Sequence, residues 1–243
     1  MAEQPARPAA RTAFYITPTH PCSYLPEQWA ATLFADPVGP MNNGLYSALL
    51  ANGFRRSGEY LYRPQCPACR ACVPVRVAID SFRPNRNQRR TWLHNQDLEV
   101  RPVPPVFTID HYSLYRRYVS ARHPGDDMQN LTPERFITFL AARWANTVFY
   151  EFRRGIDVVA VAAVDRVDDA LSAVYTFFDT DEERRSLGRY AVLYEIEQAR
   201  TKGLRWLYLG YWIDACRKMR YKAEFQPLEY YCNGRWTPSA KSI

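Results

Sequence analysis

The sequence lacks any long apolar run. Its longest aliphatic stretch, residues 158–164, is far shorter than the ~20 residues that span a bilayer. The N-terminal residues are rich in Pro, Ala and Arg and show no apolar segment typical of a secretory signal. We therefore expect a cytoplasmic protein with no membrane partner. In that compartment thiols stay reduced, so the six cysteines favour metal binding, catalysis or simple burial over disulfides.

Acidic residues are scarce between Gly53 and Arg90. Only Glu59 and Asp80 interrupt a segment that carries nine arginines. The whole chain of 243 residues has a formal net charge of +7. Such a basic segment predicts an anionic partner, which is either a phosphate chain, a carboxylate or both.

Motifs of covalent catalysis are also missing. The sequence contains no Gly-x-Ser-x-Gly elbow, and no cysteine has an obvious histidine partner. Nothing in these motifs therefore points to a covalent enzyme intermediate. Neither internal repeats nor low-complexity tracts occur beyond the N-terminus.

Composition divides the chain into three parts. Residues 1–13, rich in Pro and Ala, are expected to be disordered. The proline-rich residues 102–105 mark a boundary. Before it we expect a small N-terminal Cys- and Arg-rich domain (14–103), and after it a second domain (107–243).

Local signals predict three elements in the first domain. A helix is expected from Asn43, its cap, to Gly53. The alternation of Val73–Ile79 predicts a strand with one buried face, at a sheet edge because of Pro74. Pro84 opens a short helix. On it three arginines fall at helical spacing and form one basic face: Arg86, Arg89 and Arg90.

The second domain reads as two helices, three strands, a helix, a strand, a polar link and a last strand. Thr108 and Thr132 are expected to cap the first two helices. Strands are expected near residues 148–152, 158–164, 171–178, 204–212 and 228–232. This order matches the core of the GNAT acyltransferase fold. The sequence therefore predicts an α+β protein with a GNAT-like domain, in which helices flank a mixed β-sheet.

GNAT enzymes hold coenzyme A with a loop that resembles Arg/Gln-x-x-Gly-x-Gly/Ala at the start of a helix. Residues 185–190 match this loop except at the end, where Tyr190 replaces a small residue. A bulky side chain there would crowd the pyrophosphate. An acyl donor other than coenzyme A is therefore expected.

Several long strings identify a closer resemblance. They are CSYLP (22–26), GFRRSGEYLYRPQCPACRACVPVRV (53–77), RNQRR (86–90), SLGRY (186–190) and LGYWIDACRKMRYKAEFQPLE (209–229). In these strings the chain resembles the bacterial aspartate/glutamate leucyltransferases, which are relatives of the eukaryotic arginyl-tRNA–protein transferases. The match covers nearly the whole chain after residue 13.

The resemblance implies that leucine moves from leucyl-tRNA to the α-amino group of proteins with N-terminal Asp or Glu, which marks them for N-degron proteolysis. Aminoacyl-tRNA is then the co-substrate, and no cofactor is required for transfer. Three alternatives remain: an arginyl-tRNA–protein transferase, a coenzyme A-dependent GNAT N-acetyltransferase, and a non-catalytic RNA-binding metal module. The oligomeric state is not predicted.

Two groups of basic residues are candidates for substrate binding. The acidic side chain of the acceptor needs a bidentate cation. The candidates are Arg55 and Arg56, then Arg63 and Arg76. Alternatively, one of each pair is structural and pairs with Glu59 or Asp80. The choice between Arg55 and Arg56 stays open, because adjacent residues of a strand point in opposite directions. The candidates for tRNA binding are Arg83, Arg86, Arg89, Arg90, Trp92, Lys218 and Lys222.

Four residues are candidates for the catalytic centre. Ser186 and Gly188 offer N–H groups for a terminal phosphate or an oxyanion. Tyr190 contacts either the donor or the core, and Asp214 is either a proton acceptor or a cap. Two glutamates are expected on a solvated helix face: Glu195 and Glu197.

The cysteines allow two interpretations. Cys66, Cys69 and Cys72, with Cys22 as a fourth, meet the ligand count of a Zn site or an iron–sulfur cluster. Alternatively, they are reduced thiols in a turn-rich segment. The eukaryotic relatives are associated with an iron–sulfur cluster and have a second cysteine where this chain has Leu25, which argues against the same cofactor here.

Overall fold

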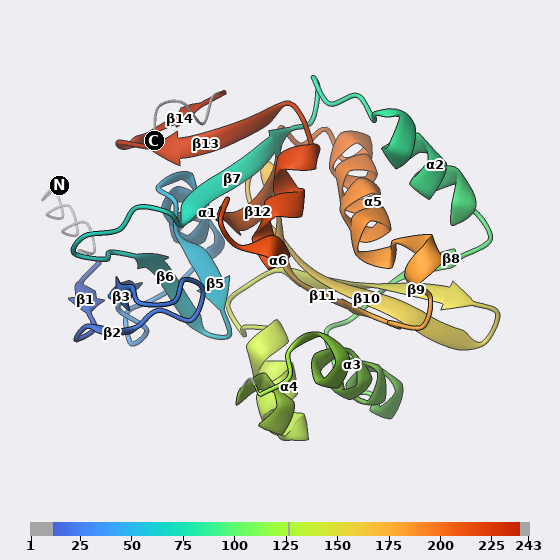
Figure 1. Ribbon diagram of the computed structural model, residues 1–243, viewed down its shortest axis with the longest axis horizontal. Coiled ribbons are helices and arrows are strands. Elements are labelled where there is room, and N and C mark those ends of the chain that lie inside the picture. The colour runs from blue at the N-terminus through green and yellow to red at the C-terminus, as the bar shows by residue number, and fades with distance from the viewer. Residues whose placement is uncertain (1–11, 126, 239–243) are drawn as a thin grey trace, which may run out of the picture.

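The computed structural model describes residues 12–125 and 127–238. Of the N-terminal residues expected to be disordered, 1–11 lie outside this part. A mixed sheet of order β14-β13-β7-β12-β11-β10-β9-β8 forms the centre of the molecule, and helices flank it (Figure 1). This confirms the mixed sheet with flanking helices. None of the described helices has the length and apolar character needed to cross a membrane.

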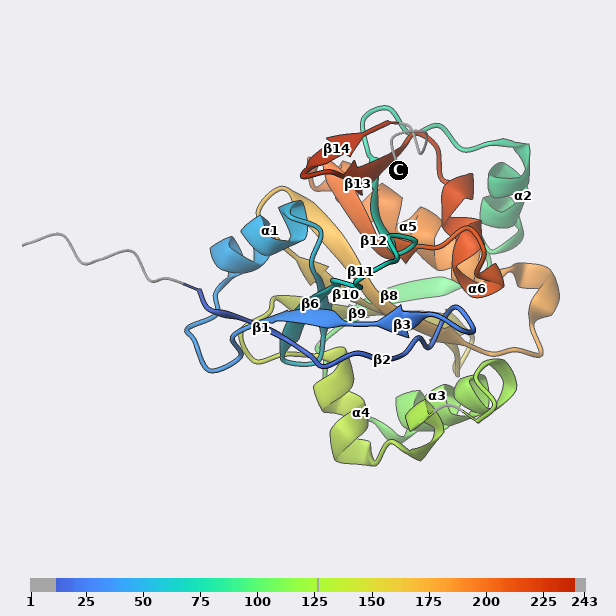
Figure 2. The ribbon, with the colours of Figure 1, turned by 60° about the vertical axis from the view of Figure 1, so that its left-hand side comes forward.

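The large sheet takes strands from both halves of the chain. Its strands are β7 (Val73–Ala78), β8 (Glu99–Val103), β9 (Thr147–Arg154), β10 (Asp157–Arg166), β11 (Ala170–Phe178), β12 (Trp206–Trp212), β13 (Leu228–Cys232) and β14 (Arg235–Thr237). A smaller sheet of order β1-β4-β6-β5 stands beside it (Figure 2). Its strands are β1 (Phe14–Ile16), β4 (Thr32–Ala35), β5 (Arg55–Ser57) and β6 (Tyr60–Pro64). A separate pair is formed by β2 (His20–Pro21) and β3 (Trp29–Ala30).

The helices begin where local signals place them. They are α1 (Asn43–Ala51), α2 (Arg86–His94), α3 (Ile109–Arg122), α4 (Pro133–Leu140), α5 (Leu187–Thr201) and α6 (Arg217–Arg220), with 3₁₀ turns η1 (Asp127–Asn130), η2 (Glu183–Arg185) and η3 (Tyr221–Glu224). Thr108 and Thr132 cap α3 and α4 as expected. The cap of α1 is Asn42, one residue before the expected one. Asn85 caps α2 with a capping box.

Two helix layers enclose the large sheet. Helices α2 and α5 lie on one face, and α3 and α4 lie on the other (Figure 1). Strand β10 is therefore buried on both of its faces. Ala160, Ala162 and Val164 pack in the cluster that contains α5, whereas Val161 and Ala163 pack in the cluster that contains α3 and α4. A strand that is covered on both faces reads as a continuous apolar run.

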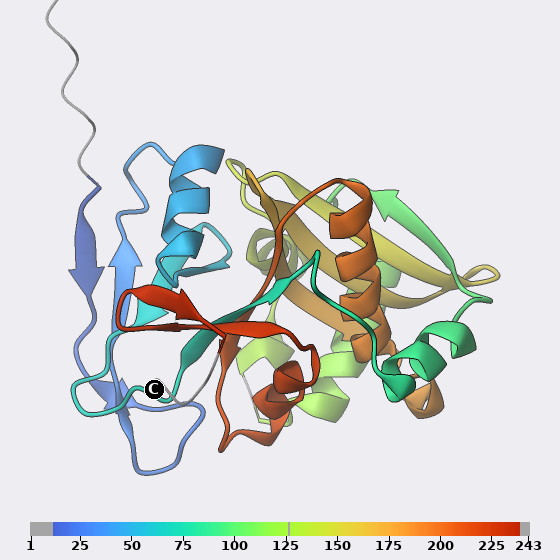
Figure 3. The same ribbon diagram turned by 90° about the horizontal axis from the view of Figure 1, so that it is seen from above.

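Strand β7 lies inside the sheet, so the edge position expected from its proline is wrong. It pairs with β12 on one side and with β13 on the other, and Figure 3 shows it running beside β13. Pro74 opposes Tyr211 of β12, but pairing with β13 begins only at Val75. The missing N–H of the proline is therefore not required there. Because β7 and β8 both belong to the large sheet, the proline-rich residues 102–105 do not separate one sheet from another.

Strands β11 and β12 are the parallel neighbours in the described part of this sheet, and they pair over a short distance. Their register joins residues 170–172 to residues 206–208. Beyond these residues β12 stays paired with β7 but no longer with β11. Helix α5 connects the two strands and starts at the end where they part.

Candidate functional site

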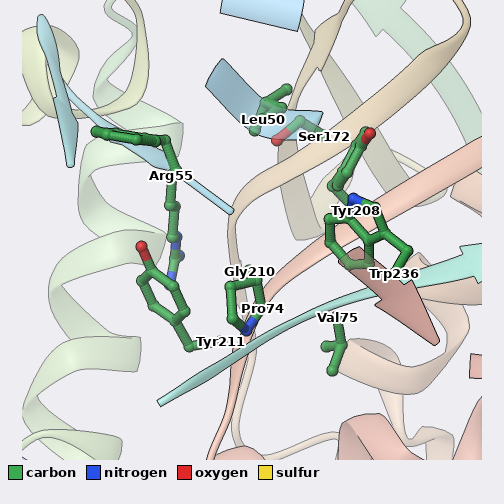
Figure 4. Close-up of a pocket in the computed structure, with 10 residues that line it drawn as sticks. Leu50, Arg55, Pro74, Val75, Ser172, Tyr208, Gly210, Tyr211 and Trp236 are labelled. Atoms are coloured by element: carbon green, nitrogen blue, oxygen red, sulfur yellow. The ribbon is translucent and has the colours of Figure 1, made fainter. Parts of the chain in front are cut away.

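The candidate site lies where β11 and β12 separate. There Arg55, from strand β5 of the small sheet, donates a hydrogen bond from Nη2 to the carbonyl of Val174 on β11 (2.9 Å). Its side chain extends toward Gly210 and Tyr211 of β12 (Figure 4). The guanidinium group thus occupies the opening between the parallel strands and connects the two sheets. Ligand sites in sheets of this kind are commonly found at such carboxyl ends.

Gly210 makes room for this arginine. A Cβ at this position would lie 3.2 Å from Cδ, Nε and Nη1 of Arg55, and φ is +74°. Both the close approach and the left-handed backbone favour glycine. On the same side a cavity of about 10 Å³ borders Arg55, which is room for about one water molecule. The Nε of Arg55 is fully enclosed and has no hydrogen-bond partner among the described residues.

Tyrosines surround the guanidinium group of Arg55. The side chains near enough to influence its charge are Tyr62, Tyr24, Tyr211 and Tyr221. The hydroxyl of Tyr211 donates to the carbonyl of Tyr62 (2.9 Å), and burial raises its pKa well above the usual range. Burial also raises the pKa of Tyr24 to about 12, so neither Tyr211 nor Tyr24 cancels the charge of Arg55 at cellular pH.

Lys222 brings a second basic group to the same strand end. Its side chain is buried, with 6% exposure. Nζ donates to the carbonyl of Tyr211 (2.6 Å) and lies 3.4 Å from Sδ of Met219. Burial, and then the nearby charge of Arg55, lower the pKa of Lys222 well below its usual value. The amine is enclosed and hydrogen-bonded inside the fold, which does not favour contact with a phosphate backbone; that Lys222 binds tRNA stays a prediction.

Arg56, the second candidate for the acceptor carboxylate, is structural. It is 1% exposed and forms an ion pair with Asp165, with distances of 2.5 Å to Oδ2 and 2.9 Å to Oδ1. It also donates to the carbonyls of Leu140 (2.8 Å) and Gly58 (3.1 Å). These contacts leave no face for a ligand. The partner is neither of the two nearby acids that the sequence suggested.

The remaining two acceptor candidates are also engaged. Arg76 pairs with Glu229 (2.7 Å). Its guanidinium carbon lies 3.6 Å from the ring centroid of Trp206 and 4.3 Å from that of Trp236. These contacts favour a structural role for Arg76 over binding of a ligand carboxylate. Arg63 donates to a backbone carbonyl (3.2 Å) and stacks at 5.2 Å on an aromatic ring.

The start of α5 is shaped by packing. Ser186 adopts a left-handed conformation (φ 53°) and does not cap the helix with its side chain. A Cβ on Gly188 would lie 2.9 Å from Cε1 of Phe178, so the glycine lets that ring approach. Tyr190 is buried, and its ring centroid lies 5.5 Å from that of Trp92. Tyr190 therefore packs in the core and does not crowd the helix start, and the partly buried Trp92 packs against it.

Basic side chains gather near the ends of α3 and α6. Nζ of the exposed Lys218 lies 3.3 Å from Nδ1 of His123, at the end of α3. Arg122 stacks at 5.8 Å on the ring of Phe178, at the end of β11. We call Arg122 and Lys218 the basic rim. Asp214 is exposed, and its carboxylate lies 3.9 Å from Arg220, so nothing fixes it as a proton acceptor.

The arginines of and before α2 are exposed on the surface. Arg83 donates to two backbone carbonyls (2.8 Å each), Arg89 to one carbonyl (2.6 Å), and Arg90 to the side chain of Asn87 (3.0 Å). In residues 12–125 and 127–238, no carboxylate pairs with these three or with Arg86. Their charges are available to a polyanion.

The cysteine candidates do not fit a metal centre in this arrangement. Cys66 is directed at a backbone carbonyl (3.8 Å), and the sulfurs of Cys22 and Cys69 accept from backbone N–H groups (3.4 and 3.5 Å). Burial first, and then the neighbouring thiols, raise the pKa of Cys72 to about 12. No group of three or more His, Cys, Asp or Glu side chains in the described ranges could hold a metal ion.

Sequence reasoning missed one buried acid. Glu195 was expected on a solvated face but is fully buried, and neither carboxylate oxygen has a hydrogen-bond partner in the described structure. Burial raises its pKa to about 8. The signal was present, because Glu195 follows Val192 and precedes Ala199 at the spacing of the apolar stripe. No comparable local signal marks Gly210 or Lys222.

Comparisons with known proteins cover almost the whole chain. Residues 20–90 match the family described as arginine-tRNA-protein transferase, N terminus, and residues 110–232 match its C terminus. The chain is 50% identical to the aspartate/glutamate leucyltransferase of Pseudomonas fluorescens (93% of this chain, 97% of that one). It is 49% identical to the protein of that name from Nitrosococcus oceani (92% and 94%). A putative lysylphosphatidylglycerol synthetase domain from Agrobacterium fabrum has a TM-score of 0.47 at 12% identity, over 71% of this chain and 52% of that one.

The two matches define the class of protein, a tRNA–protein transferase. Its two matched regions both contribute strands to one large sheet. The chain belongs to the arginine-tRNA-protein transferase family. Within it, the relatives of about half identity carry the name aspartate/glutamate leucyltransferase. The resemblance seen in the motifs is confirmed.

Proposed function

We propose that this protein transfers leucine from leucyl-tRNA to the α-amino group of proteins that begin with Asp or Glu. The product has N-terminal leucine and enters N-degron proteolysis. Relatives named aspartate/glutamate leucyltransferase match 92–93% of this chain at 49–50% identity, which supports this reaction over the alternatives. Acceptor proteins and aminoacyl-tRNA are then its two partners.

The position of Arg55, which has no carboxylate partner among the described residues, is the observation that carries the proposal. A carboxylate needs a cation that is directed at it and is not already neutralised. Among the arginine candidates of the segment, Arg56 and Arg76 have acidic partners. Arg55 has none in the described residues, and it lies where the parallel strands separate. We assign to it the recognition of the acceptor side chain.

The chemistry requires alignment more than activation. The ester of aminoacyl-tRNA is already reactive, and an α-amino group with a pKa of about 7.7–8.0 has a neutral fraction at cellular pH. Alignment of amine and ester supplies about 7 kcal/mol or more of the barrier reduction. The N–H groups of Leu187 and Gly188, in the first turn of α5, are suited to the oxyanion or to the terminal phosphate. Ser186 contributes by fixing the turn before them.

A GNAT-like core is part of the proposal. Parallel strands that part after a short pairing, with a connecting helix that starts at the opening, support it. Tyr190 does not decide the donor, because its ring lies in the core. Phe178 packs against the first turn of α5 instead. A Cβ on Gly188 would lie 2.9 Å from Cε1 of its ring.

The tRNA is assigned to two basic surfaces. The first is formed by Arg83, Arg86, Arg89 and Arg90, which are exposed and lack carboxylate partners in the described part. The second is the basic rim, which contacts the ring of Phe178 at the end of β11 through Arg122. Phosphate contacts of this kind position a nucleic acid without reading its sequence.

A transfer assay tests the proposed function. The protein is mixed with tRNA charged with labelled leucine or labelled arginine, and with peptides that begin with Asp, Glu or Ala. We expect label to pass from leucyl-tRNA to the Asp and Glu peptides and not to the Ala peptide. Transfer only from arginyl-tRNA would change the donor, and bound tRNA without any transfer would overturn the proposal.

A further inference from the structure

We propose that Lys222 is the second cation of the Arg55 site and that it takes up a proton from solvent when the acidic residue of an acceptor binds. This inference rests on the proposed function, because it assumes that Arg55 receives the acceptor carboxylate. It adds a titratable residue to that site. It also predicts that acceptor binding is coupled to pH.

The two basic groups lie against adjacent residues of β12. Arg55 lies against Gly210, where its Cδ, Nε and Nη1 are 3.2 Å from the position of a Cβ. Nζ of Lys222 is 2.6 Å from the carbonyl oxygen of Tyr211, the next residue. Arg55 comes from the small sheet and Lys222 from η3, so the two groups approach the opening from different elements.

The charge balance here differs from that around Arg56 and Arg76. Arg56 has Asp165 and Arg76 has Glu229. In the part of the chain that the structure describes, Arg55 and Lys222 form no ion pair with a carboxylate. A buried charge without a partner is costly, and an amine relieves this cost by losing its proton. The free site therefore holds one charged guanidinium group and an amine that is easily neutralised.

A bound carboxylate reverses this balance. The groups that influence Lys222 are Arg55 from β5, which favours the neutral amine, and Cys216 from the segment before α6, which favours the charged form. Phenols that also lie near Arg55 are Tyr24, Tyr62 and Tyr221, and burial raises the pKa of Tyr24 and Tyr221 above the usual range. Since neither Arg55 nor Lys222 has a carboxylate partner among the described residues, an incoming carboxylate supplies the negative charge at this site. It favours the ammonium form of Lys222, so binding draws a proton from solution.

Titration calorimetry measures this proton directly. A peptide with N-terminal Asp is titrated into the full-length protein in several buffers of different ionisation enthalpy. The dependence of the observed enthalpy on the buffer gives the number of protons taken up. We expect net uptake in wild-type protein at a pH where free Lys222 is neutral. Zero uptake by the wild type across the pH range of activity would overturn the inference without any variant.

Two substitutions assign the proton to Lys222. In Lys222→Met the uptake should disappear, and KM for Asp and Glu peptides should rise about tenfold, the effect of one charge-assisted contact. In Lys222→Arg the uptake should also disappear, but KM should stay near the wild-type value because guanidinium remains charged. Lys202→Met, which removes an exposed lysine bonded to Gln198, is the control and should change neither.

The outcomes separate this inference from the proposed function. Leucine transfer to acidic peptides with unchanged proton uptake in Lys222→Met would leave the proposed function intact and remove Lys222 from the site. A Lys222→Arg variant with KM as high as that of Lys222→Met would also contradict a charge role and indicate packing. A failure of wild-type protein to bind or modify acidic peptides would overturn both.

Discussion

Arg55 and Arg56 are neighbours on a three-residue strand, and their side chains leave it in opposite directions. Arg56 enters the core and meets Asp165, whereas Arg55 reaches the opening between β11 and β12. An arginine with a buried carboxylate partner stabilises the fold, and one without such a partner is free to bind an anion. The same residue type therefore has two roles that can be separated by experiment.

Arg55→Gln should impair acceptor recognition. Loss of charge-assisted hydrogen bonds costs about 1.5–3 kcal/mol, which is roughly a tenfold to hundredfold rise in KM for Asp and Glu peptides. KM for leucyl-tRNA should stay unchanged. Steady-state transfer kinetics with each substrate varied in turn measures both. The matched control is Arg235→Gln on β14, an exposed arginine. Equal effects on both substrates would show that Arg55 is structural.

Arg56→Met should destabilise the protein. It leaves the carboxylate of Asp165, which is 0% exposed, without its cation. Breaking one side of a buried pair costs about 3–5 kcal/mol. Urea unfolding followed by circular dichroism measures the loss. Arg143→Met is the control, because Arg143 lies 3.9 Å from Glu59 and its side chain is 97% exposed. A stable Arg56→Met protein would mean that Asp165 is satisfied by its other contacts.

Glu195 should make the stability depend on pH. In the folded protein burial raises the pKa of Glu195 to about 8, from a model-peptide value of 4.5. Between these values the unfolded chain has released the proton and the folded chain has kept it. Unfolding is therefore favoured as pH rises, and stability falls by about 1.4 kcal/mol per pH unit across this window.

Glu195→Gln removes this dependence. Relative to wild type, the variant should gain stability steadily from acidic pH to about pH 8 and then level off. Denaturant unfolding at a series of pH values tests it. Glu197→Gln, on the same helix with its partner Arg200 near the surface, should not show the trend. Parallel pH curves for wild type and Glu195→Gln would contradict the raised pKa.

At the scale of elements, α2 and the basic rim offer different contacts to tRNA. Arg86 and Arg89 project from α2 into solvent, and Lys218 belongs to the rim near α3. If both of the α2 arginines touch phosphates, Arg86→Gln with Arg89→Gln lowers the slope of log affinity against log salt by about two. Filter binding of leucyl-tRNA at several salt concentrations measures it.

The rim is tested in the same way. Lys218→Gln should lower the salt slope by about one. Arg235→Gln should leave it unchanged. A normal slope in the α2 double variant together with a reduced slope in Lys218→Gln would place the tRNA on the rim alone. The reverse result would place it on α2.

Elements whose signals are local could be predicted from the sequence. The caps Thr108 and Thr132 and the strands of the second half lie where periodicity and capping place them. The position of β7 could not be predicted, because its partners β12 and β13 lie far along the chain. Pro74 indicated an edge, and only the register shows that β13 pairs beyond it.

The site shows the same limit. Its candidate Arg55 could be named from the basic segment, but the choice between Arg55 and Arg56 required Asp165, 109 residues away from Arg56. Lys222 stands in a basic segment that looks exposed, and only the fold shows that its amine is buried against β12. Pairing and burial over such distances leave no local pattern in a single sequence.

At the scale of the whole molecule, the large sheet joins the two matched family regions. Strand β7 comes from the first region and lies between β12 and β13 of the second, while β8 covers the other end beside β9. Val73, Val75 and Val77 of β7 are part of the core under α5. Helix α1 packs against Ala170 and Tyr208 from the second region. The candidate site between the sheets therefore depends on both regions.

Cutting the chain at the proline-rich segment should therefore not produce two folded domains. A fragment of residues 107–238 loses β7 from the middle of its sheet, which exposes the edges of β12 and β13 and removes the core valines. We expect neither this fragment nor residues 12–103 to unfold cooperatively on its own. Mixed or co-expressed, the two fragments should recover a cooperative transition and leucine transfer, because β7 can pair again. Thermal unfolding of each fragment and of the mixture decides the matter. A cooperative transition in the isolated 107–238 fragment would show that the second region is an independent domain and that β7 only docks on it.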